Sequence, residues 1–183
     1  MLFRSIVYFA DINKRNVNRV CKMLGGECNC WVGDSLEIDF GVKFDLVLGN
    51  PPYNTSGQKS SGNTLYQLFI KKALNEWIKP GGYLLFVTPN AWRKPVDEKS
   101  RNRGMYELMT KDNWMKYLEI HDILDGMKTF KARTRYDWYL IQKKKPSITT
   151  IIDEKGIKNK INLKKWPWIP NFNFKLDRKS TRL

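Results

Sequence analysis

The sequence predicts an α/β domain built around a mostly parallel β-sheet. Along most of the 183 residues, strand-like segments alternate with segments that have the apolar spacing of helices. One segment, Phe44–Gly49, reads FDLVLG and is apolar throughout after its aspartate. Such a run is typical of a parallel strand that is covered on both faces. Glycine-rich stops between the segments favour short connections.

The N-terminal part predicts a strand, a helix and a second strand. Ile6–Ile12 is rich in β-forming residues and contains an acid near its end. Asn13 can cap a helix that runs to Leu24, where two glycines end it. Cys28–Val32 then predicts a short strand.

The middle of the chain continues the alternation. We expect helices over Leu65–Lys79 and Met105–Lys116, and strands over Tyr83–Val87, Tyr117–Ile120 and Tyr136–Gln142. Parallel strands of an open α/β sheet bring their carboxyl ends to one edge, and ligands bind there.

After Lys145 the pattern changes. Ser147–Ile152 and Ile157–Leu163 predict a hairpin around the turn at residues 153–156. We therefore divide the chain into a domain over residues 1–145 and a basic segment over residues 146–183.

The charge of the chain points to a polyanionic partner. The net charge is +15, from 33 basic and 18 acidic residues. Residues 143–183 contain 12 lysines and arginines against three acids, a net of +9. Such an excess indicates nucleic acid or an anionic membrane surface, although a merely solvated basic tail remains an alternative.

The cysteines and the apolar runs exclude several classes of protein. Cys21, Cys28 and Cys30 have no common zinc-binding spacing, and His121 is the only histidine, so we expect no metal site. An odd cysteine count argues against a disulfide scaffold and favours reduced thiols in the cytoplasm. No apolar run approaches the ~20 residues that span a membrane.

The strand Phe44–Gly49 is followed by Asn50-Pro51-Pro52-Tyr53. The prolines lack N–H groups, so this loop offers carbonyl acceptors, and the Asn50 side chain adds another. Acceptors suit a substrate with an amino group, and Tyr53 can stack on its ring. Two acceptors that hold an exocyclic amine would aim its lone pair at an electrophilic methyl group. The alternative is a rigid turn with no chemical role.

FDLVLGNPPY resembles the fourth motif of the S-adenosylmethionine-dependent amino-methyltransferases. The segments LYQLFIKKAL and GGYLLFVTPNAW resemble the next two motifs of the DNA adenine methyltransferases of restriction–modification systems. The resemblance covers roughly Ile6 to Lys145. It implies a Rossmann-like methyltransferase sheet with three layers, and transfer of a methyl group to adenine N6 in DNA.

The resemblance also implies the residues that bind S-adenosylmethionine. Asp11, with Ile12 beside it, is similar to the family acid that binds the ribose hydroxyls, and Asp34, with Ser35, to the acid near the adenine. Asn50 would also contact the cofactor. The alternatives are that Asp11 caps the next helix and that Asp34 is an ordinary turn residue.

A pocket that reaches the adenine amino group needs the base flipped out of the duplex. Phe130 precedes a strand, like the family aromatic that packs on the flipped base, although ordinary core packing is equally plausible. Lys131, Arg133 and Arg135 are candidates for contacts to phosphates. His121 receives no catalytic role.

One family feature is missing from the sequence. The glycine-rich loop that follows the first strand of the family has no counterpart, because no G-x-G occurs. We therefore expect a fragment that lacks the first strand and is inactive alone, with another segment or a second chain completing it. Residues 146–183 would begin a target-recognition module. Alternatives are an RNA or protein-glutamine methyltransferase and a non-catalytic nucleic-acid-binding fragment.

Overall fold

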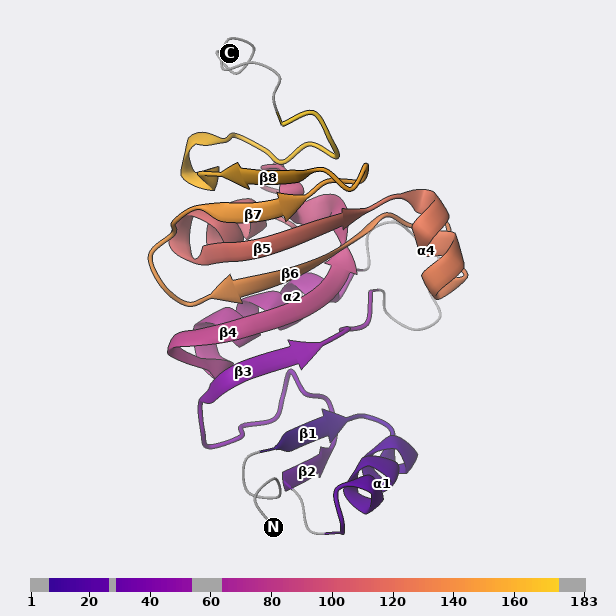
Figure 1. Cartoon of the computed structure of the whole chain (residues 1–183). Coiled ribbons are helices and arrows are strands. Elements are labelled where there is room, and N and C mark those ends of the chain that lie inside the picture. Colours follow the sequence, from indigo (N-terminus) through magenta and orange to yellow (C-terminus); the bar gives the residue numbers. More distant parts are fainter. Residues whose placement is uncertain (1–6, 27–28, 54–63, 175–183) are drawn as a thin grey trace. The chain divides into compact units, whose positions relative to one another are not determined.

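The computed structural model describes residues 7–26, 29–53 and 64–174. The chain divides into two compact units, Met1–Gly41 and Val42–Leu183. Among the described residues, each unit contains one sheet (Figure 1). Ile6, Cys28, the loop 54–63 and the basic end 175–183 lie outside the described residues.

The first unit is a β-α-β arrangement. Strand β1 (Tyr8–Asp11) pairs in parallel with β2 (Asn29–Val32), and helix α1 (Lys14–Met23) connects them. The predicted cap at Asn13 is confirmed, because its side chain accepts a hydrogen bond from the Arg15 N–H at 2.9 Å. Val17 is the residue of α1 that is fully buried.

The cysteines differ from the expectation of three reduced thiols. Cys21 on α1 is disulfide-bonded, whereas Cys30 on β2 forms no disulfide, and burial raises the pKa of its thiol. The expectation is therefore wrong for Cys21. An odd cysteine count guarantees one unpaired thiol, but it does not prevent a single bond.

The second unit is a mixed six-stranded sheet with the order β3-β4-β6-β5-β7-β8. The pairs β3–β4 and β5–β7 are parallel, and the pairs β4–β6, β5–β6 and β7–β8 are antiparallel. The strands are β3 (Phe44–Gly49), β4 (Ile78–Pro89), β5 (Trp114–His121), β6 (Tyr136–Gln142), β7 (Thr149–Ile152) and β8 (Lys158–Ile161). The predicted α/β class is confirmed.

Strand β3 is less buried than its sequence suggests. It lies at the edge of the sheet, where it pairs with β4 among the described residues. Leu46 is 48% exposed and Leu48 is 68% exposed. The prediction of a strand covered on both faces is therefore wrong for the described residues. Leu46 and Leu48 are two residues apart and therefore point to the same face of the sheet, which the described part of the chain leaves partly open at β3.

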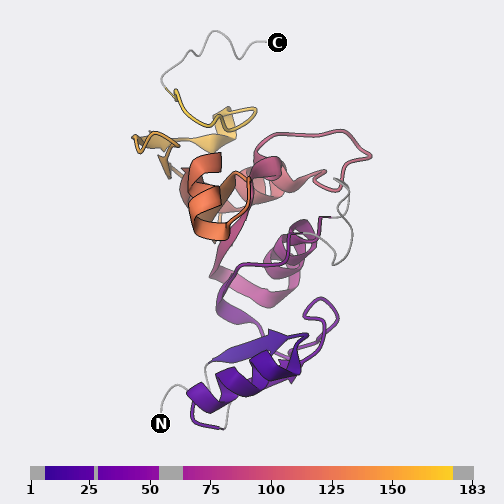
Figure 2. The ribbon, with the colours of Figure 1, turned by 90° about the vertical axis from the view of Figure 1, so that its right-hand side faces the viewer.

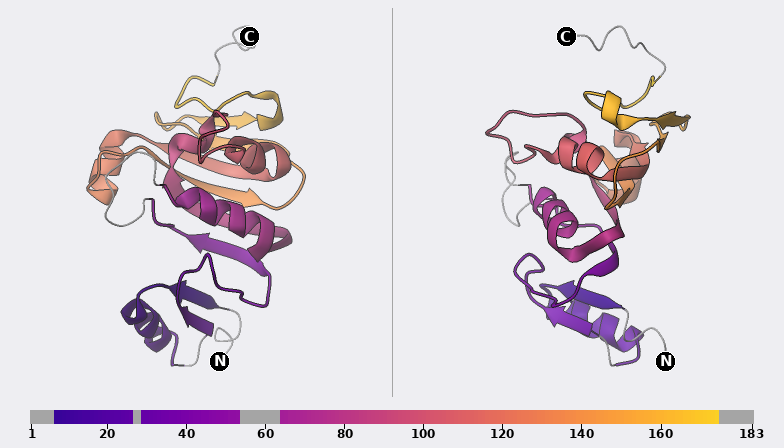
Figure 3. Two further views of the ribbon diagram at one scale, coloured as in Figure 1. Left: turned by 180° about the vertical axis from the view of Figure 1, so that it is seen from behind. Right: turned by 90° about the vertical axis from the view of Figure 1, so that its left-hand side faces the viewer.

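Helical segments cover one face of this sheet (Figure 3). They are α2 (Tyr66–Lys72), the π-helical turn η1 (Ala73–Trp77), the 3₁₀ turn η2 (Asn90–Arg93), α3 (Met105–Glu107) and the π-helical turn η3 (Leu108–Asp112). Both predicted helices end earlier than expected, because β4 begins at Ile78 and β5 at Trp114. The core residues Ile70, Leu74, Leu84 and Leu118 are at most 1% exposed.

One helix was not predicted. Helix α4 (Ile123–Phe130) lies between β5 and β6, at the end of the sheet (Figure 2). Asp122 caps it by accepting a hydrogen bond from the Asp125 N–H at 2.8 Å. Its eight residues are too few for a clear helical repeat in the sequence.

The predicted hairpin after Lys145 is confirmed as β7 and β8. Strand β7 continues the sheet beside β5, and Ile151 is fully buried. The short 3₁₀ turn η4 (Leu163–Lys165) follows. The hairpin therefore belongs to the same compact unit as β3, β4, β5 and β6, and the division at residue 145 stays a prediction. In the part of the chain that the structure describes, no helix has the length and apolarity needed to cross a membrane.

Candidate active site

The Asn-Pro-Pro-Tyr loop begins where β3 ends. Asn50 and Pro52 are exposed, and Pro51 is buried between them. The Tyr53 carbonyl accepts a hydrogen bond from the Leu65 N–H at 3.1 Å, immediately before α2. This bond anchors Tyr53, the last residue of the motif, to the residue that precedes α2. The Asn50 side chain itself is exposed, so a ligand can reach it.

Tyr53 is partly buried against α4. Its ring centroid lies 6.3 Å from that of Phe130, with an interplanar angle of 71°. The Tyr53 hydroxyl is buried without a hydrogen-bond partner among the described residues, and burial raises its pKa to about 12. Tyr53 is therefore a neutral aromatic ring at neutral pH. The structure brings together the two aromatic residues that the sequence assigned to the base.

A buried ion pair between Arg93 and Asp137 lies near the end of β4 and the start of β6. Asp137 is fully buried and its carboxylate lies 3.1 Å from the Arg93 guanidinium. Burial raises the Asp137 pKa to about 7, against the opposing effect of Arg93. Arg93 also donates to the Pro170 carbonyl at 3.2 Å and to the Asn171 side chain at 2.7 Å. These bonds attach the C-terminal segment to the sheet next to the site.

The residues predicted to contact phosphates differ in their availability. Lys131 and Arg133 are exposed, and Lys131 ends α4 in the left-handed conformation, with φ 57°. Arg135 instead lies 3.3 Å from the Glu154 carboxylate. Arg135 is thus already paired within the protein, so it is a weaker candidate than its two neighbours.

Four of the predicted cofactor residues lie at or just after the carboxyl ends of β1 and β2 in the first unit, namely Asp11, Ile12, Asp34 and Ser35. The fifth, Asn50, follows β3 in the second unit. Asp11 pairs with Val32 in the ladder, two residues before Asp34. The Asp11 carboxylate accepts from the Asn13 N–H at 2.6 Å and from the Asn16 side chain at 3.0 Å. Asp34 accepts from the Leu36 N–H at 2.9 Å. Both alternatives raised by the sequence are therefore present: Asp11 bonds to residues at the start of α1, and Asp34 bonds within its own turn.

Two further features of this edge are suited to a nucleoside. Ile12 is 78% exposed, which is unusual for a large apolar side chain. Ser35 is half-buried beside Asp34. Each carboxylate oxygen has two lone pairs, so the bonds that Asp11 and Asp34 already make leave acceptor capacity for a ribose or an amino group.

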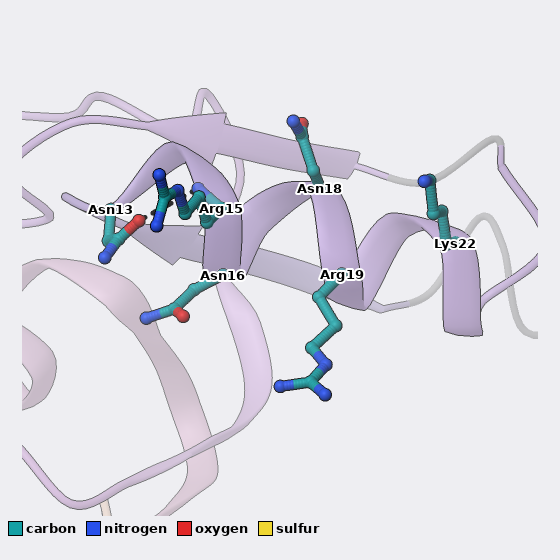
Figure 4. A pocket seen from close by; sticks show the side chains of 6 residues that line it. All are labelled: Asn13, Arg15, Asn16, Asn18, Arg19 and Lys22. Atoms are coloured by element: carbon teal, nitrogen blue, oxygen red, sulfur yellow. Dashed lines mark hydrogen bonds between the residues drawn. The ribbon is translucent and has the colours of Figure 1, made fainter.

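Sequence reasoning missed the outer face of α1. Figure 4 shows Arg15, Asn18 and Lys22 along one side of this helix, and Asn13, Asn16 and Arg19 beside them. None of the three basic side chains has an ion-pair partner in the described part of the chain. Their spacing of three and four residues is readable in the sequence as a single helical face.

Comparisons with known proteins agree with the geometry. The family model described as Eco57I restriction-modification methylase matches residues 30–130. The modification methylase CviBIII of Paramecium bursaria Chlorella virus NC1A is 32% identical over 87 residues, covering 41% of this chain and 22% of that protein. An uncharacterized adenine-specific methylase of Mycoplasma pneumoniae is 42% identical over 59 residues, covering 30% and 13%.

The fold has counterparts among solved structures. The methyltransferase subunit of a type I restriction-modification system from Streptococcus thermophilus superposes with a TM-score of 0.59 at 17% identity. The superposition covers 84% of this chain and 38% of that subunit. The chain spans about a fifth or less of the curated relatives named above. The fold is therefore the Rossmann-like fold of methyltransferases, and the chain belongs to the Eco57I restriction-modification methylase family.

Proposed function

We propose that the protein to which this chain belongs transfers a methyl group from S-adenosylmethionine to adenine N6 in DNA, as the modification enzyme of a restriction–modification system. The observation that carries the proposal is the placement of Phe130 against Tyr53, at the end of a loop that presents Asn50. An exposed acceptor next to two aromatic rings matches the needs of a purine that carries an amino group.

The roles of the residues follow from their chemistry. The Asn50 side-chain oxygen and a carbonyl of the Pro51-Pro52 pair accept the two hydrogens of the adenine amino group. These two hydrogen bonds direct the nitrogen lone pair, which is otherwise delocalised into the ring. Tyr53 and Phe130 replace the stacking that the base loses when it leaves the duplex. No charged side chain is needed at the reacting nitrogen, so the contribution is positioning and electrostatic complementarity.

The residues of the first unit fit the nucleoside half of the cofactor. Asp11 would accept from the ribose hydroxyls, Asp34 and Ser35 would meet the adenine amino group, and the exposed Ile12 would cover an adenine face. S-adenosylmethionine, when bound, supplies the methyl group. Lys131 and Arg133 would contact backbone phosphates near the flipped base.

The exposed edge of β3 supports a proposal about completion of the domain. Leu46 and Leu48 present apolar surface on an edge strand, which proteins normally cover or pair. We infer that a further segment of the protein, or a second chain, pairs with β3 and covers these side chains. A DNA-modifying enzyme of this kind works in the cytoplasm.

The test compares the protein that contains this chain with its Asn50→Ala variant. Transfer of tritiated methyl groups to adenine-containing duplex DNA should fall by about 10²–10³-fold, the usual effect of losing one positioned polar group. Unchanged thermal unfolding is expected, since Asn50 is exposed. Transfer within threefold of the original rate would overturn the mechanism. Parallel assays with RNA and with a glutamine-containing peptide identify the alternative substrates.

A further inference from the structure

A single carboxylate connects three elements next to the candidate site. The Asp125 Oδ2 atom of α4 lies 2.9 Å from His121 Nδ1, at the end of β5. The same oxygen accepts a hydrogen bond from the Tyr136 hydroxyl, at the start of β6. Asp125 therefore joins the strand that precedes α4 to the strand that follows it.

Ring contacts extend this connection to the aromatic pair. The His121 and Tyr136 rings stack with centroids 4.3 Å apart and an interplanar angle of 1°. Phe130 meets Tyr136 edge-on, with centroids 4.9 Å apart. Tyr53 also meets Phe130, with ring centroids 6.3 Å apart. The Phe130 ring thus contacts both Tyr136 and the Asn-Pro-Pro-Tyr loop.

The backbone that follows Phe130 is packed tightly on α4. A methyl group added at Gly126 would lie 2.0 Å from the Thr134 carbonyl oxygen, so only glycine allows this approach. The Thr134 N–H also donates to the Ala132 carbonyl at 2.8 Å, which tightens the turn. Residues 131–135, which include the two proposed phosphate-binding side chains, are therefore fastened to the helix that carries Asp125.

We propose that His121, Asp125 and Tyr136 are positioning residues that hold the Phe130 ring in contact with Tyr53, so that the two rings together form the surface against which one purine base packs. This proposal rests on the proposed function, because it concerns the same base-binding site. Groups around a binding site hold it in its productive geometry when their own positions are locked by packing and hydrogen bonds. The Asp125 carboxylate contacts His121 on β5 and Tyr136 on β6. Its removal should therefore loosen α4 together with residues 131–135.

Glu119 completes the surroundings of His121. Its carboxylate lies 3.6 Å from His121 Nε2, and it accepts a hydrogen bond from the Tyr117 hydroxyl at 2.7 Å. Two carboxylates thus lie on opposite sides of the imidazole. His121 is part of a connected network, although its position next to a strand end gave no sign of this in the sequence.

The first experiment measures the geometry without any ligand. In the full chain, nuclear Overhauser contacts between the Tyr53 and Phe130 rings are recorded for the original protein and for Asp125→Ala, Tyr136→Phe and Gly126→Ala. We expect the contacts to be lost in Asp125→Ala and Gly126→Ala and weakened in Tyr136→Phe, which keeps the ring but loses the hydroxyl. Asp112→Ala, an exposed acid on η3, removes the same charge as a matched control and should leave the contacts intact.

The second experiment measures the effect on a base. A single-stranded oligonucleotide that carries one fluorescent adenine analogue needs no flipping, so its quenching reports stacking in the site. We expect quenching by the original chain and by Asp112→Ala, and its loss in Asp125→Ala. If the original chain does not quench the probe, while the ring contacts still depend on Asp125, the base-binding function fails and the positioning network stands.

Two outcomes would overturn the network. Ring contacts that persist unchanged in both Asp125→Ala and Gly126→Ala would show that Phe130 is held by other packing. If Asp125→Ala does not fold, Tyr136→Phe decides the question, because it removes one hydroxyl. Quenching by Tyr136→Phe equal to that of the original chain, with unchanged contacts, would then contradict the proposal.

Discussion

Tyr53 and Phe130, which come from the loop after β3 and from the last residue of α4, lie edge to face with ring centroids 6.3 Å apart. Edge-to-face pairs at this separation are mutually attractive. The contact joins the motif with the clearest chemistry in the sequence to a helix that the sequence did not predict.

Substitutions at Tyr53 should separate the ring from its hydroxyl. Tyr53→Ala removes a stacking surface worth about 1–3 kcal/mol per base, so probe binding should weaken strongly. Tyr53→Phe should be mild, because the buried hydroxyl has no hydrogen-bond partner among the described residues. Titration with the fluorescent oligonucleotide measures both. Equal damage from the two variants would show that the hydroxyl has a role and that stacking is not the main contribution.

Alkaline pH should destabilise the protein. Burial raises the pKa values of Tyr53 and Tyr106 to about 12, above their ordinary value of 10.0. The unfolded chain therefore ionises first, so this stability is fully present below pH 10 and is lost as the pH rises toward 12. Urea denaturation at pH 8 and at about pH 11 should show a lower midpoint at the higher pH. Tyr53→Phe serves as a control, since it should reduce the difference, and an unchanged midpoint would count against the effect.

The buried pair of Arg93 and Asp137 should be sensitive to removal of one partner. Arg93→Leu leaves a fully buried carboxylate and frees the Pro170 carbonyl, a change that typically costs about 3–5 kcal/mol. The double variant with Asp137→Asn should be less damaging above pH 7, because no buried carboxyl then has to take up a proton or remain as an unpaired charge. Denaturant unfolding of the three proteins gives the comparison. A double variant less stable than Arg93→Leu would contradict this explanation.

Salt dependence should reveal whether the C-terminal basic surface binds DNA. Deletion of residues 146–183 is unsuitable, because it removes β7 and uncovers β5. Substitution of the exposed Lys158, Lys160, Lys164 and Lys165 by glutamine preserves the sheet. Each lost phosphate contact should reduce the slope of log affinity against log salt by about 0.9. Equal slopes before and after substitution would indicate a solvated surface.

The sequence by itself determined the local features of the protein. Strand positions, the cap at Asn13, the hairpin of β7 and β8 and the chemistry of Asn50-Pro51-Pro52-Tyr53 depend on neighbouring residues, and patterns of two to seven residues report them. The sequence also placed Asp11 at the end of a strand and Asp34 in the turn after the next strand. Their cofactor roles stay predictions.

Only the tertiary structure decided which of these features meet. The pairing of β5 with β7, the exposed edge at Leu46 and Leu48, and the bonds from Asp125 to His121 and Tyr136 all join residues from different elements. Such contacts depend on strand order and on which surfaces find a partner, and neither is encoded in a local pattern. Helix α4 illustrates the reason, because its short sequence has a weak repeat and its position depends on contacts with β5, with β6 and with the backbone of Thr134.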